Sequence, residues 1–175
     1  MNNKVRLMVF AALISAVDII FTRIINIDLP GPTRINFEIT IAGLAGYLLG
    51  PIWASLSLIV SDLIGMLLYT GPMGFSLFFT ISAALRGILF GILLYKKPVK
   101  ITRSILSISI VFLLVDFLLN TYWLSIMMEL SYFPYLISRL PKLILIPINA
   151  ALLHIFLILI NKVLKFDKNP IVTIK

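Results

Sequence analysis

The chain has 175 residues, of which 61% are hydrophobic and 13% are charged, too few charges to cover a water-soluble domain. This composition indicates an all-α integral membrane protein, because the apolar runs are too continuous for a β-barrel. The net charge of +8 is typical of Lys and Arg flanking membrane spans, so we expect no nucleic-acid binding. The absence of cysteine excludes disulfides and thiolate sites, and we expect no metal and no cofactor.

Six apolar segments follow one another, and we interpret residues 1–175 as a single membrane domain of six transmembrane helices. The expected helices span about residues 6–25, 35–50, 52–71, 75–95, 104–128 and 138–163. Turn and loop residues separate them. These joints are Asn26–Asn36, Gly50-Pro51, Thr70–Gly74, Lys96–Arg103 and Glu129–Ser138.

Basic residues determine the expected orientation, because Lys and Arg concentrate in cytoplasmic loops. They precede the first span, fill the loop after the fourth and follow the sixth, and these places share one side if the spans alternate. Both termini are therefore expected in the cytoplasm of a multi-pass plasma-membrane protein. The residues are Lys4, Arg6, Lys96, Lys97, Lys100, Arg103, Lys162, Lys165 and Lys168.

Small residues recur at every fourth position in the first four spans, a spacing that lets helix backbones approach closely in a bilayer. We expect most of these ridges to pack inside the chain. The first span is terminal, so its ridge of Ala12 and Ala16 could instead face a partner protein. The other ridges are Ala42, Gly46 and Gly50; Ser57, Ser61 and Gly65; and Ala83, Gly87 and Gly91.

Ionisable residues inside spans are costly unless they have a partner or line a watery cavity. Asp62 and Arg86 lie near mid-depth on spans joined by a short turn, which predicts a structural ion pair. His154 is the only histidine, which favours a packing residue over a proton relay. The other intramembrane ionisable residues are Asp18, Asp116 and Lys142.

Two polar stripes indicate a cavity near the non-cytoplasmic side, because consecutive spans can face each other. If both spans are regular α-helices, the acid, amide and indole on one face of the fifth span lie opposite two cations and an amide on one face of the sixth span. With Arg23 and Arg34 at the same level, this cavity would suit a flat, polar anion. An interfacial aromatic belt with snorkelling cations is the alternative, and the residues leave both open. The stripes are Asp116, Asn120, Trp123 and Met127, and Arg139, Lys142, Ile146 and Asn149.

Five stretches carry a family resemblance: AALISAVDIIFTR (11–23), PGPTRINFE (30–38), IAGLAGYLLGPIWASLSLIVSDLIGMLL (41–68), LLNTYWLSIM (118–127) and RLPKLILIPIN (139–149). In this order and spacing, the chain resembles the substrate-binding S components of energy-coupling factor (ECF) vitamin transporters. It is most similar to their folate-specific branch, FolT. The resemblance covers nearly the whole chain.

The resemblance implies a six-helix protein that binds folate from outside and delivers it inward by toppling in the membrane. It implies docking on an energising module, a transmembrane T component contacted through Ala12 and Ala16 and two ATPases that hydrolyse the ATP. Arg86 and the segment Met73–Phe79 depart from the family pattern near the presumed pocket. The binding residues expected from the stripes and the resemblance are Arg23, Arg34, Asn36, Tyr69, Phe75, Asn120, Tyr122, Trp123, Arg139 and Lys142.

Other functions stay open at this point. The chain could be an S component for another anionic vitamin such as pantothenate, which needs cations but no aromatic clamp. It could be a secondary transporter coupled to protons or sodium through Asp18, Asp62 or Asp116. An enzyme acting on lipid through Asp116 and His154 has the least support, because no GxxxxGK[ST], HExxH or GxSxG motif occurs. We therefore expect no enzymatic activity in the chain itself.

Overall fold

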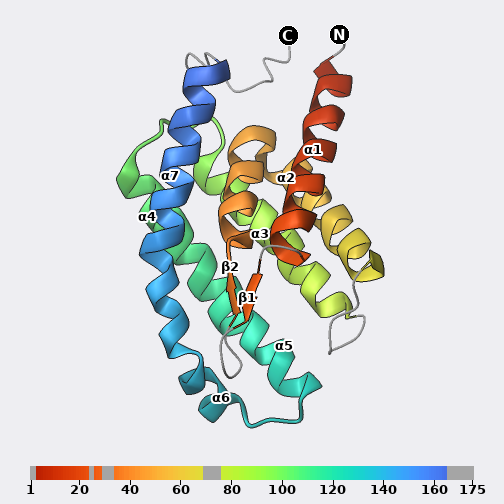
Figure 1. Ribbon diagram of the computed structural model, residues 1–175, viewed down its shortest axis with the longest axis vertical. Coiled ribbons are helices and arrows are strands. Elements are labelled where there is room, and N and C mark those ends of the chain that lie inside the picture. The colour runs from red at the N-terminus through yellow and green to blue at the C-terminus, as the bar shows by residue number, and fades with distance from the viewer. Residues whose placement is uncertain (1–2, 24–25, 29–33, 69–75, 165–175) are drawn as a thin grey trace.

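The structure, a computed structural model, describes residues 3–23, 26–28, 34–68 and 76–164. This part of the chain forms a helical bundle with a short β-hairpin (Figure 1). The α-helices are α1 (Asn3–Arg23), α2 (Glu38–Leu68), α3 (Leu77–Leu94), α4 (Ile101–Val111), α5 (Asn120–Met127), α6 (Tyr132–Ser138) and α7 (Leu145–Leu164). A π-helix, η1 (Phe112–Leu119), joins α4 to α5, and a 3-10 helix, η2 (Leu140–Ile144), leads into α7.

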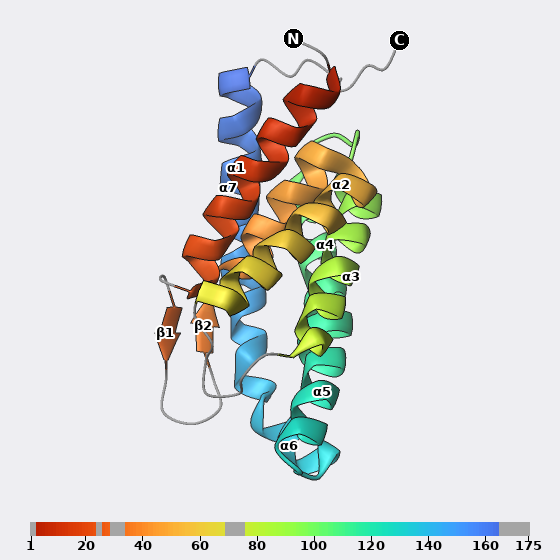
Figure 2. The same cartoon turned by 90° about the vertical axis from the view of Figure 1, so that its right-hand side faces the viewer.

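Four helical stretches of the described chain are long and apolar enough to cross a membrane: Glu38–Leu68, Leu77–Leu94, Ile101–Met127 and Leu140–Val163. To these, α1 adds a helix of 21 residues. At Gly50, α2 bends sharply, since its φ of 77° lies in the left-handed region that favours glycine. Figure 2 shows one arm of α2 leading up to this bend and the other returning from it. With the two arms counted separately, the all-α membrane fold with six membrane helices is confirmed.

Glycines bring α2 and α3 into backbone contact. A Cβ added to Gly91 would lie 2.3 Å from the Cα of Pro51, and one added to Gly87 would lie 2.5 Å from the backbone nitrogen of Ser55. Real Cβ atoms do not approach a backbone this closely, so a larger residue would force the helices apart. Packing inside the chain, as predicted for these small-residue ridges, is confirmed at these positions.

The rod from α4 to α5 is not the regular α-helix that the sequence predicted. The π-helix η1 occupies eight of its residues. A π turn holds more residues than the 3.6 of an α-helix, so the side chains beyond it are rotated from their expected positions. Short π-segments occur frequently at functional sites, and this one contains Asp116.

A short antiparallel hairpin lies within the expected loop Asn26–Asn36. The strand β1 (Asn26–Asp28) pairs with β2 (Arg34–Asn36), and Ile27 stands opposite Ile35. The sequence did not predict this sheet, because strands of three residues are too short to show an alternating pattern.

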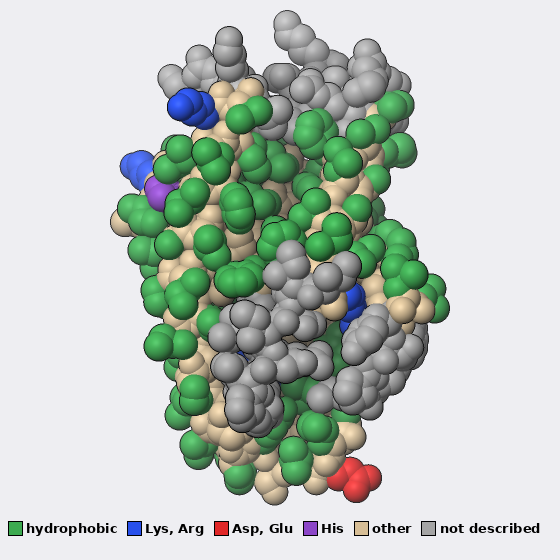
Figure 3. Space-filling model, in the orientation of Figure 1, with side chains coloured by type: hydrophobic (Ala, Val, Ile, Leu, Met, Phe, Trp, Pro, Cys, Tyr) green, Lys and Arg blue, Asp and Glu red, His purple; other side chains and the backbone are tan. Residues whose placement is uncertain are grey.

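The two ends of the bundle differ in the elements they carry. The start of α1 and the end of α7 lie at one end, and α6 lies at the other (Figure 1). Hydrophobic side chains cover most of the described surface visible in Figure 3, whereas Lys and Arg are few. This arrangement fits a protein surrounded by lipid, with both terminal helices reaching the same membrane face.

Candidate binding site

Polar side chains gather on α5 and on the two short helices that follow it. Asn120 and Trp123 belong to α5, Arg139 follows α6, and Lys142 belongs to η2. The positive charges of Arg139 and Lys142 both act on Asp116, one turn before Asn120. The structure thus brings together the polar groups that the sequence placed on the fifth and sixth spans.

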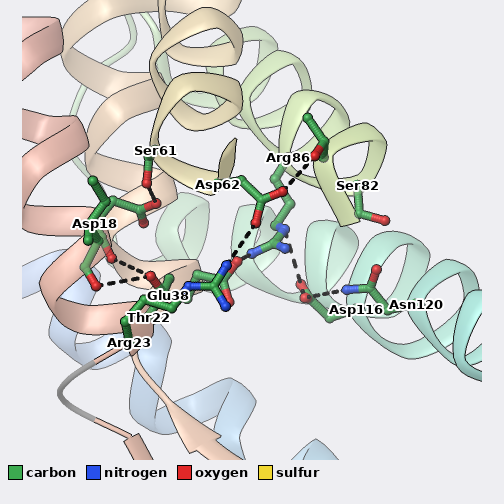
Figure 4. A network of polar contacts seen from close by, with 12 residues as sticks. Asp18, Thr22, Arg23, Glu38, Ser61, Asp62, Ser82, Arg86, Asp116 and Asn120 are labelled. Carbon is green, nitrogen blue, oxygen red and sulfur yellow. Dashed lines mark hydrogen bonds and ion pairs between the residues drawn. The ribbon is translucent and has the colours of Figure 1, made fainter. Parts of the chain in front are cut away.

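A chain of charged contacts joins this region to α2 and α3 (Figure 4). Asn120 donates from Nδ2 to Asp116 Oδ1 over 3.3 Å, and Arg86 Nε lies 3.9 Å from the same oxygen. Arg86 also donates from a terminal nitrogen to a carboxylate oxygen of Glu38, at the start of α2. With only 5% of its surface exposed, Arg86 is a buried cation held between two carboxylates.

Aromatic rings stack beside this chain of charges. Phe78 of α3 lies on Trp123 with ring centroids 4.5 Å apart and planes 12° apart. Tyr122 lies 5.3 Å from the same indole at an angle of 56°, and Tyr132 lies 6.1 Å from Tyr122. Phe78 was not expected at the site from the sequence, although it lies in the segment Met73–Phe79 that departs from the family pattern. Such rings provide a flat apolar surface next to polar groups.

Arg139 is a buried cation between α5 and α6. A terminal nitrogen of Arg139 donates to Thr121 Oγ1 over 2.8 Å, and its guanidinium lies 5.8 Å from the ring centroid of Tyr135. Burial lowers the pKa of Arg139, whereas Tyr135 and Asp116 act to raise it. Because arginine stays charged at neutral pH, the site keeps a permanent positive charge in a defined position.

Four buried polar atoms between η1 and Arg139 have no hydrogen-bond partner among the described residues: Asp116 Oδ2, Asn120 Oδ1, Trp123 Nε1 and Arg139 Nε. Arg86 Nε of α3 also lacks one. A buried polar group without a partner costs about 1–3 kcal/mol, and native proteins contain few of them. Two acceptors and two donors are therefore unsatisfied beside a flat aromatic surface. A polar ligand could satisfy all four at once.

Asp62 and Arg86 do not form the predicted ion pair, so that prediction is wrong. Asp62 accepts a hydrogen bond from Thr80 Oγ1 over 2.8 Å, and Arg23 NH2 lies 3.5 Å from its other oxygen. Adjacency along the chain pointed to the next span, whereas α1, which is distant in sequence, supplies the cation. Arg23, predicted at the binding site, is thus engaged with α2.

Other predicted binding residues fall outside the described part of the chain. Tyr69 and Phe75 are among them, as are the side chains of Arg34 and Asn36. Their roles stay predictions. Within the described residues, no group of three His, Cys, Asp or Glu side chains could hold a metal ion.

Two polar residues of α7 contribute to helix packing. Asn149, expected on the polar stripe, accepts from Thr40 Oγ1 of α2 over 2.8 Å through its amide oxygen. His154 Nδ1 lies 3.4 Å from Ser104 Oγ of α4, in line with the packing role expected for this histidine. The part of α7 beyond η2 is therefore tied to neighbouring helices.

The helix α1 has one face packed on α2 and another that is exposed. On the packed face, Ser15 donates to the backbone oxygen of Ser57 over 2.9 Å. The exposed face joins small residues with large apolar ones. It consists of Ala12 and Ala16 with Val5, Met8, Val9, Leu13, Val17 and Ile20.

Comparison with known proteins identifies the family. Residues 6–164 match the family model of the ECF transporter, substrate-specific component. The chain belongs to this family. It is 32% identical to the folate transporter FolT of Clostridium novyi (strain NT) over 173 residues, 95% of this chain and 99% of that protein. The resemblance inferred from the sequence is confirmed.

Solved structures of S components share this fold. The crystal structure of FolT bound with folic acid matches with a TM-score of 0.73 and 31% identity, over 82% of this chain and 86% of that one. The S component for biotin from an ECF-type ABC transporter matches with a TM-score of 0.66 and 26% identity, over 94% and 95%. This S component is therefore a multi-pass plasma-membrane protein that binds a substrate rather than an enzyme. Pantothenate binding and ion-coupled transport gain no support from these matches.

Proposed function

We propose that this S component binds folate from outside the cell and delivers it inward by toppling, when docked on its energising module. S components of ECF transporters work with a transmembrane T component and with ATPases, which hydrolyse the ATP. The ligand would bind in the half of the molecule that holds α6, away from the cytoplasmic termini.

The observation that most directly supports folate is the set of four unsatisfied polar atoms between an aromatic stack and two cations. Folate combines a flat pteridine ring with a tail that ends in carboxylates. The ring offers apolar faces and polar edges, and the tail needs positive charge. Pantothenate, in contrast, has no ring to place on an aromatic surface.

In this proposal, the two parts of folate use different residues. The pteridine ring lies against the aromatic surface of Trp123 and Tyr122, and Asn120 binds its edge. The glutamate carboxylates accept charge-assisted hydrogen bonds from Arg139 and Lys142. Since Phe78 already stacks on one face of the indole, a ring entering between them would have to displace Phe78.

Calorimetry on the purified protein tests the ligand, with biotin and pantothenate as comparison vitamins. We expect binding of folate alone, accompanied by quenching of tryptophan fluorescence. The chain contains two tryptophans, so variants can assign the quenching. Trp123→Phe should remove most of it, and Trp53→Phe, on α2, should retain it. Binding of biotin or pantothenate without folate would contradict the proposal.

We also propose that Ala12 and Ala16 lie at the contact with the T component, because they form an exposed small-residue ridge on α1. Ala12→Leu with Ala16→Leu should abolish co-purification with the T component and the ATPases while folate binding stays unchanged. The matched control is Ala151→Leu, at an exposed alanine of α7, which should leave assembly intact. Loss of folate binding in the double variant would instead indicate misfolding.

A further inference from the structure

Asp116 is a partly buried acid on the polar stripe of the fifth span, and it was not among the binding residues expected from the sequence. One of its carboxylate oxygens faces Asn120 Nδ2 at 3.3 Å and Arg86 Nε at 3.9 Å. The other oxygen has no hydrogen-bond partner among the described residues. The side chain is 21% exposed, so this free acceptor lies in a region of limited access to solvent.

Arg86 lies beside this carboxylate and compensates its charge. It is buried, and it pairs with Glu38 on one side and with Asp116 on the other. The contact with Asp116 uses only one carboxylate oxygen (Figure 4). Arg86 of α3 therefore places a positive charge beside one oxygen of Asp116, while the second oxygen has no hydrogen-bond partner among the described residues.

Asn120 adds a second acceptor beside the first. A carboxylate only accepts hydrogen bonds, so the amide of Asn120 must turn its nitrogen toward Asp116. The amide oxygen is then left for another donor, and it has no partner among the described residues. Two free acceptors therefore come from residues one helical turn apart.

We propose that Asp116, together with Asn120, selects ligands whose ring carries an exocyclic amino group next to a ring N–H. A pterin presents these two donors side by side on one edge, and they match the two free acceptors. This inference rests on the proposed function, because it names the group that the site recognises in folate.

The chemistry of the two acceptors also accounts for exclusion of other vitamins. Pantothenate has no planar edge with two adjacent N–H groups. The ureido group of biotin places a carbonyl between its two N–H groups, so an acceptor would face the carboxylate of Asp116. A buried acceptor opposite another acceptor leaves both unsatisfied, which disfavours binding.

Competition against radiolabelled folate tests this inference, with pterin and lumazine as matched competitors. Lumazine is a pteridine with a carbonyl in place of the exocyclic amino group. In the wild-type protein, pterin should compete about tenfold or more better than lumazine, as expected for a lost hydrogen bond to a charged group. In Asp116→Asn, whose amide can donate as well as accept, this preference should fall toward equality.

Asp62→Asn is the matched control, because Asp62 is also a partly buried acid but bonds with Thr80 and Arg23. It should keep the preference for pterin. A wild-type protein that binds folate without preferring pterin to lumazine would overturn the inference alone, as would an unchanged preference in folded Asp116→Asn. If size exclusion shows that Asp116→Asn does not fold, the preference of the wild-type protein for pterin over lumazine decides whether the inference holds. Absence of folate binding in the wild-type protein would overturn the proposed function as well.

Discussion

The contact between α2 and α3 and the cluster around Asp116 use membrane helices in opposite ways. At the first, Gly87 and Gly91 bring two backbones together until no side chain fits between them. At the second, polar and aromatic side chains lie between the helices, and several of their buried polar atoms, among them Asp116 Oδ2 and Asn120 Oδ1, have no hydrogen-bond partner among the described residues. The first region is closed by direct backbone contact, whereas the second keeps polar groups that a ligand could bind. Mutations should therefore separate folding from binding.

The largest effect is expected at the α2–α3 contact. Gly91→Ala would place a methyl group 2.3 Å from the Cα of Pro51, and a backbone cannot yield as a flexible side chain does. We expect a loss of about 3 kcal/mol of stability or more, measured as a lower Tm in detergent. The neighbouring Ile92→Ala is the control, since Ile92 is 55% exposed, and it should change the Tm little. A normal Tm in Gly91→Ala would show that the helices can separate.

The next effect is expected at the site. Arg139→Ala removes a buried cation that also donates to Thr121, and it should weaken folate binding about 30-fold or more. Calorimetry measures the affinity, and the Tm reports the fold. Arg103→Ala, in the first turn of α4, should leave the affinity unchanged. If Arg139→Ala and Arg103→Ala bind folate with the same affinity, Arg139 does not contact the ligand.

A smaller effect is expected at Arg23, and it tests whether this residue belongs to the packed region or to the binding site. Because Arg23 pairs with Asp62, Arg23→Ala should lower stability by about 1 kcal/mol, while folate affinity should stay within about twofold. Arg23→Lys keeps a cation and should lose less stability. A strong loss of affinity with an unchanged Tm would place Arg23 in the binding site instead, as the sequence suggested.

The smallest effect is expected at the rim of the aromatic stack. Tyr122 is 48% exposed and touches Trp123 at an angle, so it contributes only part of the flat surface. Tyr122→Leu should weaken folate binding about fivefold, or about 1 kcal/mol, in a fluorescence titration. Tyr95→Leu, beyond the end of α3, should have no effect. A loss as large as that of Arg139→Ala would make the tyrosine a principal contact.

Much of the fold could be predicted because lipid imposes simple rules on sequence. Continuous apolar runs marked the spans, Gly50 and Pro51 marked the bend in α2, and basic residues marked the cytoplasmic end. The π-helix could not be predicted, because its longer-range hydrogen bonds produce no distinct pattern of residue types. The hairpin could not be predicted either, because strands of three residues are too short to show an alternating pattern.

The grouping of polar residues could be predicted where they stood out against an apolar background. Asn120 and Arg139 were conspicuous in this way, and the structure brings their helices together. Phe78 was missed because one more aromatic residue in an apolar span carries no signal. The pairing of Asp62 was assigned wrongly because its partner comes from a helix distant in sequence, which spacing alone does not reveal.

The π-helix has a consequence for how this span tolerates changes in length. Deleting one residue from α4 would turn everything beyond it by about 100° around the helix axis. Trp123 would then leave Phe78 and point toward lipid. Within η1 the same deletion removes the surplus residue of a wide turn, so the flanking helices can revert to ordinary winding and keep their faces. A shortened descendant of this protein could therefore retain its substrate only if the loss fell within that one wide segment.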